Sequence, residues 1–266
     1  MSKNSLNLTK DPISVLFVKI AIPSSVGTVF MTLYNLVDTY FAGKISAEAL
    51  AALAQTFPVY FIIIAIGVGL SIGTTSLIAN ALGEKDQKKG SYYLAQSIGL
   101  SIITSILVSL VGIYFGPSII LLMNDSEVTM KLSMEYLNII FLGSIFILVQ
   151  MTMNSSLSAI GDTKSNRNVL IVSFFLNILL NPLFIFGYGI IPAMGIKGIA
   201  VSTITSQSLG TFYIIYKVYK TEFKEYLYLQ CFKPKFKILL DLLSQGIPAA
   251  LGMMMISVGV FIILFF

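Results

Sequence analysis

Apolar residues in this chain are gathered into long runs that short polar segments separate. An α-helix needs roughly 20 residues to cross the hydrocarbon core of a bilayer, so each run is a candidate membrane span. The candidate spans lie at residues 15–41, 54–81, 92–115, 133–159, 169–188, 196–219 and 245–266. The pattern predicts an all-α integral membrane protein, built as a six-helix transmembrane bundle plus a seventh helix.

The longest polar connection divides these spans into two groups. We predict a first six-helix lobe over residues 1–220, a cytoplasmic interlobe loop over 221–243, and the first helix of a truncated second lobe over 244–266. A weak internal echo across the loop supports a repeated bundle: Ile22, Pro23 and Gly27 recur as Ile247, Pro248 and Gly252. The sequence stops inside an apolar run, so we expect most of a second lobe to be missing.

Composition agrees with a membrane protein and removes several kinds of chemistry. Hydrophobic residues make up 56% of the chain and charged residues 11%, whereas soluble domains have about 25% charged residues. The chain has no histidine and a single cysteine, Cys231. A Ser-His-Asp triad, a cysteine zinc site and an intrachain disulfide are therefore excluded. Although Gly69–Gly73 matches the G-x-S-x-G pattern of hydrolases, we interpret it as a helix-packing motif. The prediction is a protein that is not an enzyme and needs no cofactor.

The net charge of +5 comes from positions that indicate orientation rather than nucleic-acid binding. Basic residues are concentrated at the N-terminus and in the loops after the second, fourth and sixth spans, among them Lys3, Lys10, Lys85, Lys88, Lys89, Lys164, Arg167 and Lys217. The opposite loops hold only Lys44, Lys131 and Lys197. Because short cytoplasmic loops are enriched in Lys and Arg, we predict a multi-pass protein of the inner or plasma membrane with a cytoplasmic N-terminus.

One carboxylate, Asp38, lies inside the first apolar span. Tyr34 and Met31 share its flank of a helix. An ionisable group in hydrocarbon is costly and normally faces a protein interior or a wet cavity, which favours an ion- or proton-handling role. A position near the helix end, reaching the lipid headgroups, is the alternative.

Three later spans carry amides and hydroxyls that could join this carboxylate. Asn177 and Asn181 lie one helical turn apart, and Pro182 frees the carbonyl oxygen of residue 178. Amide oxygens and a carboxylate suit a small hard cation. Thr203 in the sixth span and Asn154 in the fourth are further polar candidates. Hydrogen bonding between neighbouring helices explains such residues equally well.

Several stretches together resemble the multidrug and toxic compound extrusion (MATE) transporters. They are IPSSVGTVFMTLYNLVDTYFAGKISAEALAALA from Ile22, GLSIGTTSLIANALGEKDQKKG from Gly69, SSLSAIGDTKSNRNVLIVSFFLNILLNPLFIFG from Ser155, and GIKGIAVSTITSQ from Gly195. The resemblance extends over essentially all of residues 10–266. It implies a protein of two six-helix lobes that exports drugs and other amphipathic organic compounds in exchange for Na⁺ or H⁺, by alternating access.

The resemblance also implies a cation or proton site at Asp38, Asn177, Asn181 and Thr203, with Na⁺ as the only metal ion considered. We assign Tyr34, Met31 and Asn154 to the substrate cavity. The most similar branch of the family has a second acid where this chain has Asn181, and another branch has a glutamate where this chain has Ile256. The identity of the coupling ion is left open.

Two other functions are compatible with the same fold. A flippase for lipids or lipid-linked sugars should have basic residues inside its spans to hold phosphates, and this sequence has essentially none. The other reading is that the 266-residue chain transports nothing alone. Expected partners are membrane lipid, drug-like small molecules and the missing lobe, with no nucleic acid.

Overall fold

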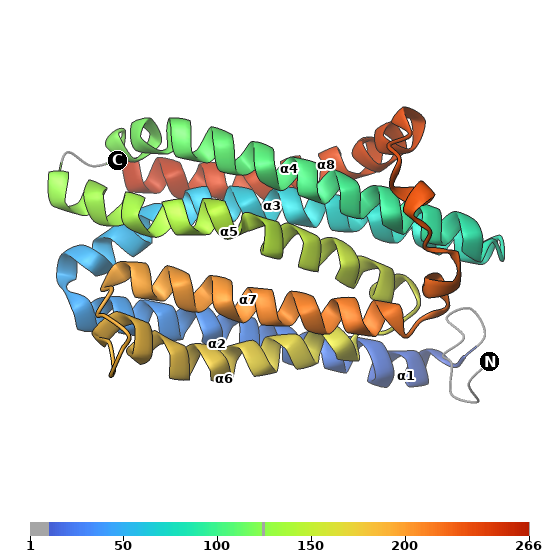
Figure 1. The fold of residues 1–266 in the computed structure, drawn as a ribbon, viewed down its shortest axis with the longest axis horizontal. Coiled ribbons are helices and arrows are strands. Elements are labelled where there is room, and N and C mark those ends of the chain that lie inside the picture. Colours follow the sequence, from blue (N-terminus) through green and yellow to red (C-terminus); the bar gives the residue numbers. More distant parts are fainter. Residues whose placement is uncertain (1–10, 124–125, 266) are drawn as a thin grey trace.

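A computed structural model describes residues 11–123 and 126–265 (Figure 1). Within this part of the chain the secondary structure is helical, apart from an isolated antiparallel bridge between Tyr188 and Ile191. The elements are α1 (Ile13–Leu16), a π-helical turn (Phe17–Ala21), α2 (Ile22–Ile45), α3 (Ala47–Gly83), α4 (Gln87–Leu121), α5 (Glu127–Ala159), α6 (Lys164–Phe186), α7 (Ile196–Tyr219), two 3₁₀ turns (Glu222–Tyr226 and Leu229–Phe232) and α8 (Phe236–Phe265). The all-α prediction is confirmed.

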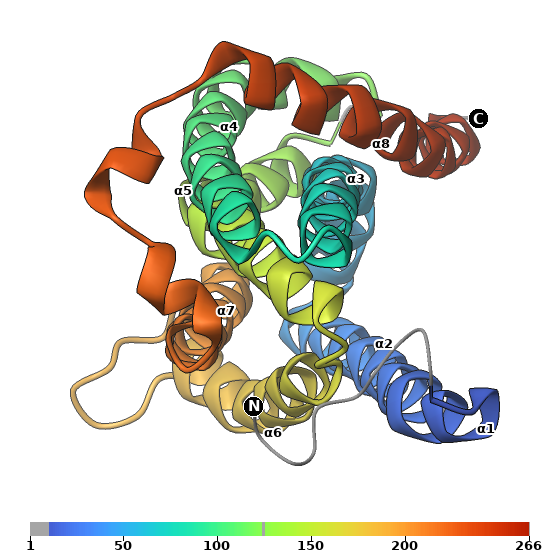
Figure 2. The ribbon, with the colours of Figure 1, turned by 90° about the vertical axis from the view of Figure 1, so that its right-hand side faces the viewer.

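The helices form a bundle whose centre is α5, seen end-on in Figure 2. α5 packs on α3, α4 and α7, while α2 packs on α6 and α6 on α7. The largest core cluster includes Ile63, Leu137, Ile140, Leu148 and Ile199, all of them at most 2% exposed. The outer faces remain apolar: Leu107, Leu110 and Tyr114 of α4 are each more than half exposed. Such large exposed apolar faces are what a lipid-facing bundle requires.

In the part of the chain that the structure describes, six helices are long and apolar enough to cross a membrane: Ile13–Ile45, Ala47–Gly83, Gln87–Leu121, Glu127–Ala159, Lys164–Phe186 and Phe236–Ile263. α7 (Ile196–Tyr219), predicted as a span, is not among them. Its sequence carries Ser202, Thr203, Ser206 and Gln207, which lower its hydropathy. These polar residues belong largely to its protein-facing side, because Ser202, Thr203 and Ser206 are buried. α7 is as long as α2 and runs beside it in Figure 1.

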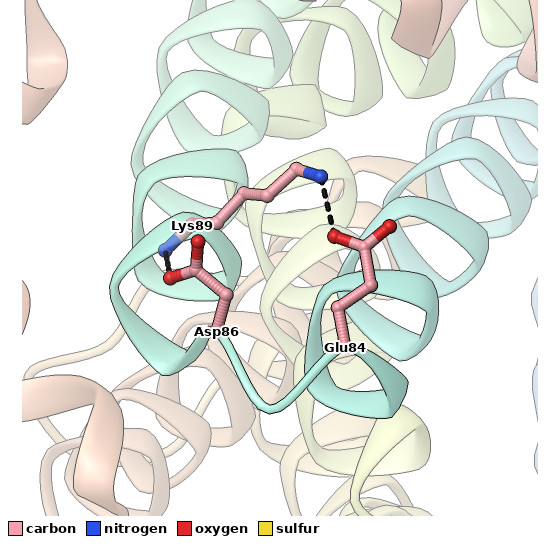
Figure 3. A network of polar contacts seen from close by, with 3 residues as sticks. All are labelled: Glu84, Asp86 and Lys89. Carbon is pink, nitrogen blue, oxygen red and sulfur yellow. Dashed lines mark hydrogen bonds and ion pairs between the residues drawn. The ribbon is translucent and has the colours of Figure 1, made fainter.

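The loops predicted to share one side of the membrane lie at one end of the bundle. The N-terminal end of α1, the α3–α4 turn and the segment after α7 are together at the right of Figure 1. In the α3–α4 turn, Asp86 caps α4 by accepting from the backbone N–H of Lys89 at 2.9 Å, and the Lys89 ammonium pairs with Glu84 at 2.6 Å (Figure 3). Lys3 and Lys10 lie outside the described residues. We call this end of the molecule the basic end.

The predicted interlobe loop, residues 221–243, contains the two 3₁₀ turns and the first residues of α8, which begins at Phe236. Gln96 of α4 holds this segment through hydrogen bonds to three backbone groups. Its Nε2 donates to the carbonyls of Cys231 (2.5 Å) and Lys233 (2.8 Å), and its Oε1 accepts from the N–H of Lys235 (2.9 Å). α8 then packs along α3. The segment between α7 and α8 is therefore docked on the bundle.

Candidate cation site between helices α2, α6 and α7

Asp38 lies on the buried face of α2, where it is 7% exposed. That face repeats at helical spacing through Gly27, Tyr34, Asp38 and Ala42. Gly27 lets α6 approach closely, because an added Cβ would lie 3.0 Å from Leu170 and 3.5 Å from the Cα of Arg167. Asp38 lies on the same face and meets α6 further along the pair of helices. The prediction that this carboxylate faces the protein interior agrees with its burial, and the alternative of a headgroup-facing carboxylate does not.

Two amides of α6 meet one oxygen of this carboxylate. The Nδ2 groups of Asn177 and Asn181 each donate to Asp38 Oδ1 at 2.8 Å, and Asn181 Nδ2 also lies 3.1 Å from Asn177 Oδ1. Both asparagines are fully buried. Their spacing of one helical turn puts them on the same face of α6, so a single carboxylate can accept from both.

A third helix reaches the other carboxylate oxygen. Thr203 Oγ1 of α7 donates to Asp38 Oδ2 at 3.3 Å, and Thr203 is 1% exposed. Three helices that are distant in sequence thus converge on one buried carboxylate. Hydrogen bonds from neutral donors offset part of the cost of burying such a group. We call Asp38, Asn177, Asn181 and Thr203 the Asp38 cluster.

The Asp38 cluster keeps acceptor oxygens without hydrogen-bond partners. Asn181 Oδ1 is buried and unpaired, as is the hydroxyl of Tyr34, which lies beside Thr203 and Asn177. Unpaired buried polar atoms are uncommon and call for an explanation. Oxygen atoms of carboxylate, amide and hydroxyl groups are the ligands that hard cations prefer. Among the described residues no group of three His, Cys, Asp or Glu side chains gathers to hold a metal ion. A single carboxylate among neutral oxygens is the kind of donor set that suits a monovalent cation or a proton.

Two tyrosines that the sequence analysis missed surround the same carboxylate. Tyr60 of α3 and Tyr136 of α5 are close enough to interact electrostatically with Asp38. Their positions far along the chain gave no signal, because only the packing of α3 and α5 brings them near α2.

The predicted substrate-cavity residues are placed differently from one another. Tyr34 is buried in contact with the Asp38 cluster, whereas Met31, on the same helix, is 42% exposed. Asn154 lies on α5, which packs mainly on α3, α4 and α7. Its Oδ1 is buried without a hydrogen-bond partner.

Solved structures resemble this chain over nearly all of its length. A multidrug resistance MATE family transporter of the MOP superfamily, in its outward-facing conformation, matches 90% of the chain with a TM-score of 0.80 and 29% identity. A MOP superfamily transporter from Pyrococcus furiosus Vc1, described as having a binding pocket of reverse polarity, matches 95% with a TM-score of 0.84 and 27% identity. The chain covers 52% and 55% of those two proteins, respectively.

Relatives of known name agree. The multidrug export protein MepA of Staphylococcus aureus is 26% identical over 91% of this chain, and the probable multidrug resistance protein NorM of Thermotoga maritima 28% identical over 91%. An FAD transporter of Shewanella oneidensis is 28% identical over 77% of the chain. The chain spans about half the length of these proteins: 53%, 52% and 45%, respectively. The MatE family model matches residues 23–183. The chain thus belongs to the MatE family of membrane transporters, which are not enzymes.

Proposed function

We propose that this chain forms the first lobe of a cation-coupled antiporter that exports drugs and other amphipathic organic compounds. The observation that carries the proposal is the buried carboxylate of Asp38, held by donors from two other helices. A membrane protein that keeps an ionisable group away from lipid at this cost normally uses it for ion or proton handling. The names of two relatives, the multidrug export protein MepA and the probable multidrug resistance protein NorM, support this substrate class.

The coupling ion would bind at the Asp38 cluster. A proton would neutralise Asp38 and convert one carboxylate oxygen into a hydrogen-bond donor. Na⁺ would instead take oxygens from Asp38, Thr203 and the unpaired Asn181 Oδ1. A proton would remove, and Na⁺ would compensate, the negative charge that attracts the two amides of α6 to α2. The amides of α6 would then lose their hydrogen bonds to Asp38 and take other partners. Binding of the ion would in this way change how α2 packs on α6.

The helix that carries Asp38 has an irregular backbone near the basic end. The π-helical turn Phe17–Ala21 ends two residues before Pro23, whose ring nitrogen has no hydrogen to donate. π-Helical turns and prolines are recognised points of helix bending. We place the cytoplasm at the basic end, because Lys and Arg are retained on that side of the membrane. Ion binding would then bend α2 on its cytoplasmic side and change access to the cavity.

The test is export from cells that make the full-length transporter of which this chain is proposed to be the first lobe. Ethidium efflux is measured under an imposed Na⁺ or H⁺ gradient for the wild type, Asp38→Asn and Asp241→Asn. Asp241 lies on α8, outside the Asp38 cluster, and provides the same chemical change as a control. We expect Asp38→Asn to reduce gradient-driven efflux at least tenfold and Asp241→Asn to leave it unchanged. If Asp38→Asn exports ethidium at the wild-type rate, Asp38 has only a structural role as a hydrogen-bond acceptor.

The FAD transporter relative makes an anionic, phosphate-bearing substrate the rival candidate. Phosphate recognition inside the spans would need Arg or Lys there. In the Asp38 cluster the only charged side chain is a carboxylate, and the nearest amides are neutral. A cationic or neutral amphipathic compound fits this environment better. Efflux that FAD inhibits and ethidium does not would reverse the assignment.

A further inference from the structure

A groove lies between α6 and α7, on the basic-end side of the Asp38 cluster. Its volume is about 330 Å³, and its apolar wall includes Val172, Leu176 and Leu209. Val172 and Leu209 are 55% and 49% exposed, so the groove opens to the outside of the bundle, above a buried floor that includes Val169 and Ser206. In a protein that spans a membrane, the outside of the bundle at this level is lipid.

The groove covers the length of about one lipid leaflet's acyl region. Its lining residues on α6 run from Asn168 to Leu176, which is about 12 Å along a helix axis. Half of the hydrocarbon core of a bilayer is about 15 Å thick. The lining begins near the first residue of α6, Lys164, at the basic end. The groove therefore faces the leaflet that lies at the basic end.

Cationic side chains stand at the mouth of the groove. The Arg167 guanidinium donates to Oδ1 of Asn168, a lining residue, at 2.8 and 3.2 Å. On the facing helix, the Lys217 ammonium lies 5.7 Å from the ring centroid of Tyr213, another lining residue. The nearby carboxylate of Asp162 is occupied by the backbone N–H and the hydroxyl of Ser165. The mouth is thus positive, and an organic cation would be repelled from it.

The side of the bundle that carries the groove is not the side that α8 covers. α8 packs on α3 and α4, and Figure 2 shows it across the bundle from the α6–α7 pair. The chain that follows the interlobe segment thus approaches the first lobe elsewhere. An apolar groove left open on the outer surface of a membrane-spanning bundle faces lipid acyl chains.

We propose that this groove binds an anionic phospholipid, with one acyl chain between α6 and α7 and the phosphate held by Arg167 and Lys217. Basic groups at the mouth of a groove between transmembrane helices are a known form of anionic-lipid recognition. Arg167 is the only arginine in the chain, and its planar guanidinium can bind a phosphate through two parallel hydrogen bonds. The Asn168 amide nitrogen is available to the ester region below the phosphate.

The absence of tryptophan from the chain allows a direct test. The purified chain carrying Phe212→Trp, an exposed position on α7 next to Tyr213, is reconstituted in phosphatidylcholine vesicles with increasing brominated phosphatidylglycerol. Bromine quenches tryptophan on contact. Ile103→Trp on α4, 50% exposed, reports an unselective lipid contact as the control. We expect quenching at position 212 to show a preference for phosphatidylglycerol of several-fold over brominated phosphatidylcholine, and position 103 to show none.

The charge of the mouth is then removed in the Phe212→Trp background. Arg167→Gln and Lys217→Gln should each lower the preference roughly fivefold, toward unity, with a smaller effect in high salt. Lys237→Gln, which removes an exposed lysine at the same end on α8, should not change it. Circular dichroism checks that each variant is folded. If Phe212→Trp does not fold, Phe175→Trp on α6 serves as the tryptophan reporter instead. Equal quenching by both lipids would overturn the proposal. So would displacement of the brominated lipid by the organic cation tetraphenylphosphonium to the same extent in wild type and in the charge variants.

Discussion

Asn181 Nδ2 lies 2.8 Å from Asp38 Oδ1 and donates to it, so an amide occupies the position at which a second acid would face this carboxylate. The oxygen of the same amide, Oδ1, is buried and unpaired. Asn181 therefore both satisfies Asp38 and leaves one acceptor open. This arrangement makes the position a natural place to change the charge of the site.

Asn181→Asp should strengthen cation binding. Two buried carboxylates at this distance repel each other unless a cation or a shared proton lies between them. We expect Na⁺ affinity to rise at least tenfold, equivalent to about 1.4 kcal/mol. Binding of ²²Na⁺ to purified protein measures it. Asn154→Asp on α5 makes the same substitution outside the cluster and should leave affinity unchanged. No gain in Asn181→Asp, for Na⁺ or for proton-dependent binding, would argue against a cation site here.

The amides of α6 should matter more for stability than the hydroxyl of α7. Asn177→Ala removes a 2.8 Å donor to a charged acceptor, whereas Thr203→Val removes a 3.3 Å donor with little change in shape. Hydrogen bonds to charged groups are worth about 1.5–3 kcal/mol in soluble proteins, and those between membrane helices average about 0.6 kcal/mol. In detergent, the midpoint temperature of thermal unfolding should be lowest for Asn177→Ala, higher for Thr203→Val and highest for wild type. The reverse order would mean that the longer hydrogen bond, from Thr203, contributes more to stability than the one from Asn177.

The Asp38 cluster could be predicted because its members are polar residues in apolar surroundings. Asp38, Asn177, Asn181 and Thr203 each interrupt a hydrophobic run, and such interruptions stand out in a sequence. Tyr60 and Tyr136 did not stand out, because tyrosine is common in apolar helices and only tertiary packing brings these two near Asp38. The order of the helices could be predicted as well, because each long apolar run in the sequence marks one helix.

The segment between α7 and α8 is where sequence reasoning was least informative. The last span was predicted to begin at residue 245, whereas in the structure the same helix begins at Phe236. Gln96 gave no sign that it would hold this segment, since its partners are backbone atoms, which every residue has. Backbone partners leave no trace in the pattern of side chains.

Gln96→Ala should release the segment from α4. The substitution removes the side-chain partner of three backbone groups, and Cys231 in the same segment is only 9% exposed. We expect the rate of maleimide labelling at Cys231, the only cysteine in the chain, to rise at least tenfold. Gln87→Ala, which removes a hydrogen bond between α4 and the Glu222 carboxylate at the protein surface, should have a much smaller effect. Equal labelling in Gln96→Ala and wild type would show that Phe223 and its apolar contacts hold the segment without help.

The contact between α3 and α8 should depend on Gly246. A Cβ added there would lie 2.7 Å from the backbone carbonyl oxygen of Gly69, and backbone cannot move aside as a flexible side chain can. Gly246→Ala must therefore push the two helices apart, at a cost of about 1–3 kcal/mol typical of overpacking. Gly252→Ala on the same helix adds its methyl group to open space and should be neutral or slightly stabilising, since alanine favours helix over glycine.

The two glycine variants are compared by thermal unfolding and by the distance between spin labels on α3 and α8. Ser257 Oγ donates to the carbonyl of Pro58 at 2.7 Å further along the same pair of helices, so the far end of the contact has its own anchor. We expect Gly246→Ala to widen the spacing near Gly69 more than near Pro58. A uniform separation would mean that the two helices move as rigid rods. No separation at all would mean that the close approach at Gly246 does not limit their packing.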